Sequence, residues 1–112
     1  MESILTSIKR HVNIVEECED FDAVLIEHIN SVFMILTQLG VGPAEGFIIE
    51  DDSATWEDFF GNTIPFQAVK SYIFMKVKLM FDPPTNSAVT ESYNRLINEF
   101  EWRLNVAAES NN

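Results

Sequence analysis

The apolar residues of this chain recur at helical spacing, and they are densest between Pro65 and Phe81. At ~3.6 residues per turn they cover most of a helix circumference and leave one narrow polar strip of Gln67, Lys70, Ser71 and Lys78. A helix this apolar requires partners on several sides, supplied by the rest of the chain or by a neighbouring copy. We predict that it begins at Pro65, with Asn62 or Thr63 as its cap, and ends at Asp82-Pro83-Pro84, because proline cannot continue a helix.

Two further helices are predicted before this central one. The first begins at Glu2 or Ser3 and fades near Val15, with an inner stripe of Ile4, Leu5, Ile8, Val12 and Val15. The second is capped by Asp20 and runs through Leu39, where Gly40 ends it. Its inner stripe consists of Phe21, Leu25, Ile29, Val32, Leu36 and Leu39, and its second apolar flank of Ile26, Phe33 and Met34. We therefore expect this helix to face the core on one side and either core or a partner subunit on the other.

The stretch from 41 to 62 is the least helical part of the chain. Phe47-Ile48-Ile49 predicts a short strand, and residues 53–60 predict one or two helical turns with Thr55 and Asp58 as a variant capping box. The aromatic residues of the stretch are expected to fix it to the core: Phe47, Trp56, Phe59 and Phe60. Long loops in small domains are usually functional, so we expect this one to contact a partner.

A last helix is predicted to begin between Thr85 and Ser87, with an inner stripe of Val89, Tyr93, Leu96, Ile97, Phe100 and Leu104. Trp102 lies on its far face, about 200° around the helix from Phe100. An exposed tryptophan is typical of an interface; the alternative is that the first helix or the loop covers it. The predicted fold is all-α: four main helices, with a long loop between the second and third that carries a short strand and a short helix. Residues 1–108 form one domain, and residues 109–112 form a frayed tail.

Composition and charge narrow the possible function classes. The chain has 112 residues, of which 46% are hydrophobic, enough for one folded domain. Its single cysteine, Cys18, excludes an internal disulfide and fits a reducing cytoplasm, and the first residues lack the pattern of a signal peptide. The helix at 65–81 is too short and too charged for a membrane span. The net charge of −11 argues against a basic surface that holds nucleic acid, and its simplest explanation is solubility.

The residues that could carry chemistry match no catalytic or metal-binding pattern. His11, Cys18 and His28 lack zinc spacing, and no nucleophilic dyad can be assigned. The carboxylates of Glu50, Asp51, Asp52, Glu57 and Asp58 lack the alternation of a calcium loop. Gly40-Val41-Gly42-Pro43 follows a helix instead of a strand, which favours a helix stop over a phosphate cradle. Lys70, Lys76 and Lys78 lie among aromatic residues, but they are better explained as side chains covering apolar surface than as a single-strand binding site. We expect no enzymatic activity, cofactor or metal.

Six segments carry a family resemblance: INSVF at 29–33, TQLGVG at 37–42, TWEDF at 55–59, AVKSYI at 68–73, FDPP at 81–84 and EWRLN at 101–105. In content and order they resemble the small head–tail connector proteins of tailed phages that infect Gram-positive bacteria. These proteins are also called head-completion, adaptor or DNA-packaging proteins. The resemblance covers nearly the whole chain, and its motifs are signatures of a fold and not of a catalytic activity.

The resemblance implies a helical virion protein, assembled in the host cytoplasm, that forms a ring, typically twelve-fold, beneath the portal. Such a ring extends the DNA channel and offers a platform to a stopper or tail-completion protein. DNA would pass without specific binding because acidic residues repel its phosphates. No membrane partner is implied. Carried onto this chain, the resemblance implies subunit or portal contacts at Phe33, Met34, Phe47, Trp56, Phe74, Trp102, Arg103 and Val106.

The acidic charge also leaves a second hypothesis open, a small DNA mimic that inhibits a host nucleic-acid enzyme. A mimic should present regularly spaced surface carboxylates, whereas these acids gather in the connecting segments. Capture of a host nuclease or polymerase, competed by DNA, would favour the mimic.

Overall fold

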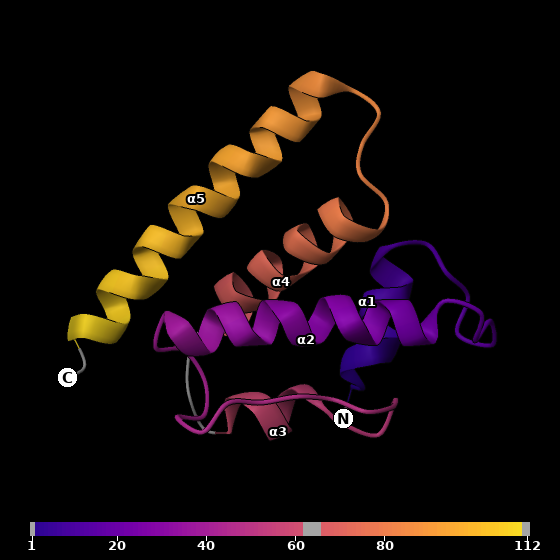
Figure 1. Ribbon diagram of the computed structural model, residues 1–112, viewed down its shortest axis with the longest axis horizontal. Coiled ribbons are helices and arrows are strands. Elements are labelled where there is room, and N and C mark those ends of the chain that lie inside the picture. The colour runs from indigo at the N-terminus through magenta and orange to yellow at the C-terminus, as the bar shows by residue number, and fades with distance from the viewer. Residues whose placement is uncertain (1, 62–65, 111–112) are drawn as a thin grey trace.

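The computed structural model describes residues 2–61 and 66–110, which form five helices (Figure 1). The helices are α1 (Ile4–His11), α2 (Asp22–Gln38), α3 (Trp56–Phe60), α4 (Phe66–Phe81) and α5 (Ser87–Ser110). The all-α class, the four main helices and the short helix in the long loop are confirmed. The short strand is wrong, since the described residues contain no strand and only one isolated bridge between Ser3 and Thr55.

The core lies where α2 packs along α4. Helix α1 packs against both, and α3 lies beside α1, where the Trp56 indole N–H donates to the Ser7 hydroxyl at 2.8 Å. The predicted inner stripe of α2 is confirmed at Leu25, Ile29, Val32 and Leu36, all of which are fully buried. On α4, the helix predicted to be central, the most buried side chains are Val69, Tyr72, Ile73 and Val77. Burial of this apolar surface is the main contribution to the stability of the fold.

The connector between α1 and α2 differs from the prediction. Helix α1 ends at His11, and Val15, predicted on its inner stripe, is 66% exposed. Asp20 is not the cap of α2: Phe21 holds the N-cap position, makes no side-chain hydrogen bond there and is exposed.

Lys9 explains why the connector turns back over α1. Its side chain is buried, donates a hydrogen bond to the Glu16 carbonyl oxygen at 2.8 Å and forms an ion pair with Asp22 at 2.9 Å. A buried charge needs such partners, so the chain leaves helical geometry at Asn13, where φ is 65°, and wraps around the lysine. The ion pair depends on charged side chains, so the spacing of apolar residues does not predict it.

The segment predicted as a strand pairs with a side chain instead. The Asn30 amide on α2 donates to the Ile49 carbonyl oxygen at 3.0 Å and accepts from the Ile49 N–H at 2.8 Å. The backbone groups that a neighbouring strand would have satisfied are therefore satisfied by one amide. Ile49 points into the core while Ile48 points outward, so the alternation seen in the sequence is real even though no sheet forms.

Side-chain caps begin helices α1 and α3. Both hydrogen bonds of the capping box between Thr55 and Asp58 are present at the start of α3. Ser3 caps α1, accepting a hydrogen bond from the Thr6 N–H. The predicted caps Asn62 and Thr63, and Pro65, lie outside the described residues.

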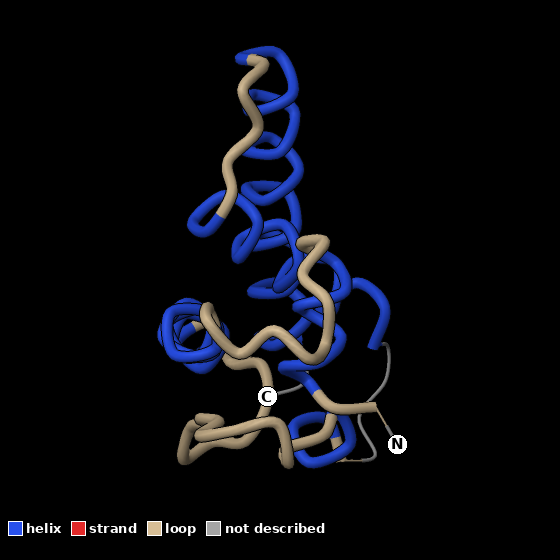
Figure 2. The backbone as a smooth tube through the Cα atoms, turned by 90° about the vertical axis from the view of Figure 1, so that its right-hand side faces the viewer, coloured by secondary structure: helices blue, strands red, loops and turns tan. Residues whose placement is uncertain are grey.

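Helix α5 lies apart from the other helices, and α4 is the element it contacts most (Figures 1 and 2). The chain leaves α4 at Phe81, as the Asp82-Pro83-Pro84 signal predicts, and Asn86 caps α5 by accepting from the Ala88 N–H at 2.8 Å. Of the predicted inner stripe, Ile97 is buried and Tyr93, Phe100 and Leu104 are half-buried. Val89 and Leu96 are exposed, because a single neighbouring helix covers only a narrow face. The first two residues of the predicted tail belong to α5, and Asn111 and Asn112 lie outside the described residues.

Candidate interaction surface

Among the described residues, Trp102 is the most exposed large apolar side chain, and it lies on the side of α5 that faces away from α4. It is 68% exposed, so neither the first helix nor the loop covers it. Arg95 and Val106 are exposed and share its face, since positions separated by four, seven and eleven residues align on a helix. With Arg103 beside it, this set forms what we call the α5 outer face: Arg95, Trp102, Arg103 and Val106.

The orientation of this face is fixed by a polar contact on the opposite side of α5. The buried Tyr72 of α4 donates its hydroxyl to the Glu101 carboxylate at 2.6 Å, and Lys76 lies 3.7 Å from the same carboxylate. Burial raises the pKa of the Tyr72 hydroxyl, and the hydrogen bond to Glu101 and the negative charge of Glu101 raise it further. The tyrosine therefore stays protonated and remains the donor. Trp102 lies about 100° around the helix from Glu101 and about 200° from the half-buried Phe100, and it projects to solvent.

The structure divides the predicted contact residues into three groups. Met34, Trp102, Arg103 and Val106 are exposed and available to a partner. Phe47 and Phe74 are half-buried, and both pack against the core. Phe33 and Trp56 are buried by their own chain, where Phe33 contacts the Phe59 ring at a centroid distance of 4.6 Å.

Aromatic contacts involve two of the side chains that the sequence analysis considered for chemistry, His11 and Lys70. The His11 ring stacks on Phe74 with a centroid distance of 4.4 Å, and burial lowers its pKa, as does the nearby charge of Lys78 to a smaller extent. Lys70 lies over the Trp56 ring at 5.1 Å, in a cation–π contact. The contact of Lys70 with Trp56 supports the interpretation that this lysine covers apolar surface, and the His11 ring has a packing role against Phe74.

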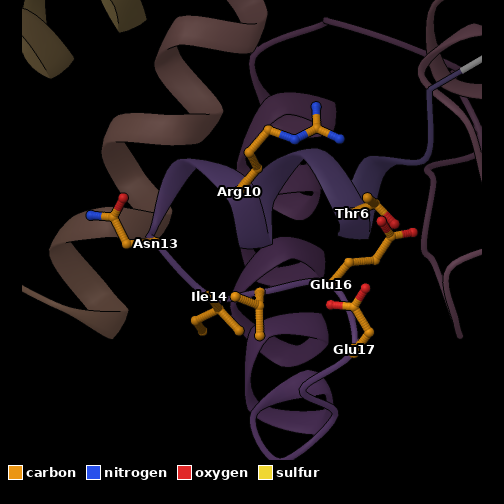
Figure 3. Close-up of a pocket in the computed structure, with 7 residues that line it drawn as sticks. Thr6, Arg10, Asn13, Ile14, Glu16 and Glu17 are labelled. Carbon is orange, nitrogen blue, oxygen red and sulfur yellow. The ribbon is translucent and has the colours of Figure 1, made fainter.

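Sequence reasoning missed a pocket beside the α1–α2 connector. It has a volume of about 450 Å³ and is lined by Thr6, Arg10, Asn13, Ile14, Val15, Glu16 and Glu17. Figure 3 shows Ile14 near its middle, Asn13 on one side, and Glu16 and Glu17 on the other side beside Thr6. The sequence signal for this pocket is the aliphatic pair Ile14-Val15 directly before the acidic run. The apolar spacing assigns Val15 to the end of the first helix instead.

A second missed surface lies where α2 begins and α4 ends. Phe21 packs edge-on against Phe81 with a centroid distance of 5.5 Å, and Phe21, Val24 and Met80 are all exposed. Val24 falls outside the apolar stripes predicted for α2, so the exposed apolar pair that it forms with Phe21 is evident only from the structure.

Within the part of the chain that the structure describes, no three His, Cys, Asp or Glu side chains come together as potential metal ligands. No helix in residues 2–61 and 66–110 has both the length and the apolarity needed to cross a membrane.

A small helical protein whose outermost helix directs an anchored tryptophan and two arginines to solvent belongs to the class of proteins that dock on others. Comparison with known families gives the same class. A family model described as phage connector protein matches residues 4–111, and the chain belongs to that family. It is therefore a connector of the bacteriophage virion. Neither the search of curated proteins nor the search of solved structures gave a significant match.

Proposed function

We propose that this connector forms a ring beneath the portal of a tailed phage that infects Gram-positive bacteria, extends the DNA channel and seats a stopper or tail-completion protein. The proposal includes a structural and non-enzymatic role, with assembly in the host cytoplasm. The observation that carries it is the exposed Trp102 on α5, in a chain whose family match covers residues 4–111. A tryptophan held outward by an anchored helix is costly to leave in water, and burial against a neighbouring subunit or the portal would remove that cost.

The charge distribution supports passage of DNA without binding. Six of the seven basic side chains, all but Arg95, lie within ion-pair distance of an acid in the described residues. Most carboxylates of the described residues have no such partner, in a chain of net charge −11. A channel lined by such a surface repels phosphates, so DNA slides without adhering.

Assembly on purified portal rings tests the proposal. The chain is mixed with portal, and the products are sized by light scattering and imaged by negative-stain electron microscopy. We expect a new ring of density on one end of the portal. Portal rings that never acquire this density, together with the absence of the chain from capsids, would contradict the proposal.

Trp102→Ala should weaken incorporation roughly 30-fold, the loss typical of an interface hot spot, and leave helix content by circular dichroism unchanged. Ile48→Ala is the matched control, because Ile48 is a similarly exposed apolar residue that lies on the long loop and not on α5. Unfolding of the Trp102 variant would mean that the tryptophan stabilises the monomer. Equal losses for both variants would assign no special role to α5.

A further inference from the structure

Two surfaces among the described residues combine exposed apolar and charged side chains, the α5 outer face and the pocket beside the α1–α2 connector. Figure 1 places them at opposite ends of the molecule: α1 and its connector at the right, and the C-terminal half of α5 at the left. The molecule measures 42 × 36 × 19 Å, so the two ends lie far apart in one copy. Contact between these surfaces is therefore available only between copies.

Arg95 gives the outer face an unsatisfied positive charge. In the described residues it is the one basic side chain without an acid at ion-pair distance, since the other six all have a partner. Arg103 pairs with Glu99 at the surface, an ion pair of the kind that exchanges partners at little cost. A protein with 18 acids and 7 bases leaves an arginine unpaired beside an exposed tryptophan, which is the composition of a hot spot.

The pocket has the complementary chemistry. Glu16 and Glu17 are exposed, and no basic side chain of the described residues lies at ion-pair distance from either. Ile14 and the strongly exposed Val15 supply apolar wall, and the Arg10 guanidinium can face an aromatic ring. The volume of about 450 Å³ is within the range of sites that bury a large side chain.

We propose that the α5 outer face of one copy docks into the connector pocket of the next, with Trp102 against Ile14 and Val15 and Arg95 facing Glu16 and Glu17. Because each copy carries both surfaces at opposite ends, the contact is head-to-tail, and such contacts close into rings when the rotation between copies is right. The inference rests on the proposed ring and specifies its subunit contact. It favours a second copy over the portal as occupant because the complementary charges and apolar wall are present on the chain itself.

Disulfide trapping tests the contact, because native Cys18 lies one residue beyond the pocket. Val106→Cys places a second cysteine on the outer face, and the variant is oxidised mildly, alone and with portal present. We expect a ladder of covalent products beyond the dimer, since every copy carries both halves of the contact. Asp52→Cys, on an exposed loop, is the matched control and should give no such ladder. Products that stop at the dimer, or no ladder under either condition, would overturn the head-to-tail contact.

Charge exchange provides the second test in the same cysteine background. Arg95→Glu alone and the double variant Glu16→Arg/Glu17→Arg alone should each reduce the ladder at least tenfold, because like charges then meet. An equal mixture of the two variants should restore the ladder. The acidic outer face of the Arg95→Glu variant then meets the basic pocket of the other variant, and the unchanged outer face of the second meets the unchanged pocket of the first. Restoration also shows that both variants are folded. A mixture no better than its components overturns the proposal.

The two proposals can fail separately. If the wild-type chain joins the portal but neither ladder nor charge rescue is seen, the copy-to-copy contact is wrong and the proposed ring stands. If Trp102→Ala abolishes portal binding while copies never cross-link, the tryptophan's occupant is the portal, which also overturns the contact proposed here. If the chain joins neither portal nor capsids, the proposed function itself is wrong.

Discussion

Gly42 shows how one residue position supports the packing of the long loop. Its φ is +89°, and a Cβ built there would lie 2.6 Å from Cε1 of the buried Phe59. Phe59 packs on Phe33 and Phe47, so the glycine permits a close approach of the loop to the aromatic part of the core. The Gly42-Pro43 pair, read in the sequence only as confirmation of a helix stop, is therefore also a packing element.

Gly42→Ala should lower the free energy of unfolding by roughly 2–4 kcal/mol, because left-handed backbone strain adds to overpacking against Phe59. Gly46→Ala is the matched control: its φ is +92°, but the nearest atom to the new Cβ would be Thr37 Oγ1 at 3.9 Å. The control should lose about 1 kcal/mol from backbone strain alone. Urea denaturation of both variants measures the difference, and equal losses would mean that Phe59 moves aside freely.

His11 makes stability depend on pH. Burial and Lys78 lower its pKa in the folded chain, so the unfolded chain binds the proton more readily. The contribution of the neutral imidazole is present above the ordinary histidine pKa of ~6.5 and is lost as the pH falls through it toward the folded value. His11→Phe keeps a ring against Phe74 without a titrating group. Denaturation between about pH 8 and pH 5 should show the wild type losing stability relative to the variant as the pH falls, with ~6.5 as the upper edge of the window. Parallel curves would refute the assignment to His11.

At the scale of elements, periodicity was sufficient wherever apolar burial decides the structure. The inner stripe of α2, the extent of α4 and the capping box of α3 follow from spacing and cap chemistry. Periodicity was insufficient where a single polar side chain determines the path of the backbone. Lys9 bends the α1–α2 connector and thereby creates the pocket, and the Asn30 amide replaces the partner strand of Ile49. Trp102 could be predicted as exposed because the apolar stripe of the last helix defines its buried face, and Trp102 lies on the opposite one. The pocket depends on the turn at Asn13, which the spacing of residues does not predict.

Helix α5 packs chiefly on α4, and the hydrogen bond from Tyr72 to Glu101 anchors it there. Tyr72→Phe removes the hydroxyl that holds Glu101, and we expect a loss of about 1.5 kcal/mol, the value of a hydrogen bond to a charged group. Amide hydrogen exchange should accelerate in α5 and stay unchanged in α2, because α5 packs chiefly on α4. Tyr93→Phe is the matched control, since no hydrogen bond of the Tyr93 hydroxyl occurs in the described residues. Acceleration spread evenly over all helices would mean that Tyr72 supports the core as a whole.

For the whole molecule, the flat shape and the separation of its unpartnered surfaces matter more than any single contact. One copy buries its core but leaves Trp102, Met34 and Val15 in water at separate places. In the proposed ring, neighbouring copies or the portal would bury these side chains. Membership of the phage connector family places the chain in the virion.

Counting the chain in purified virions tests this account most directly. Quantitative mass spectrometry of intact particles, with the portal protein as internal reference, measures the number of copies per portal subunit. The account predicts roughly equimolar amounts of connector and portal, as a ring stacked on a ring requires. Absence of the chain from mature particles, or an amount too small for one ring per particle, would contradict it.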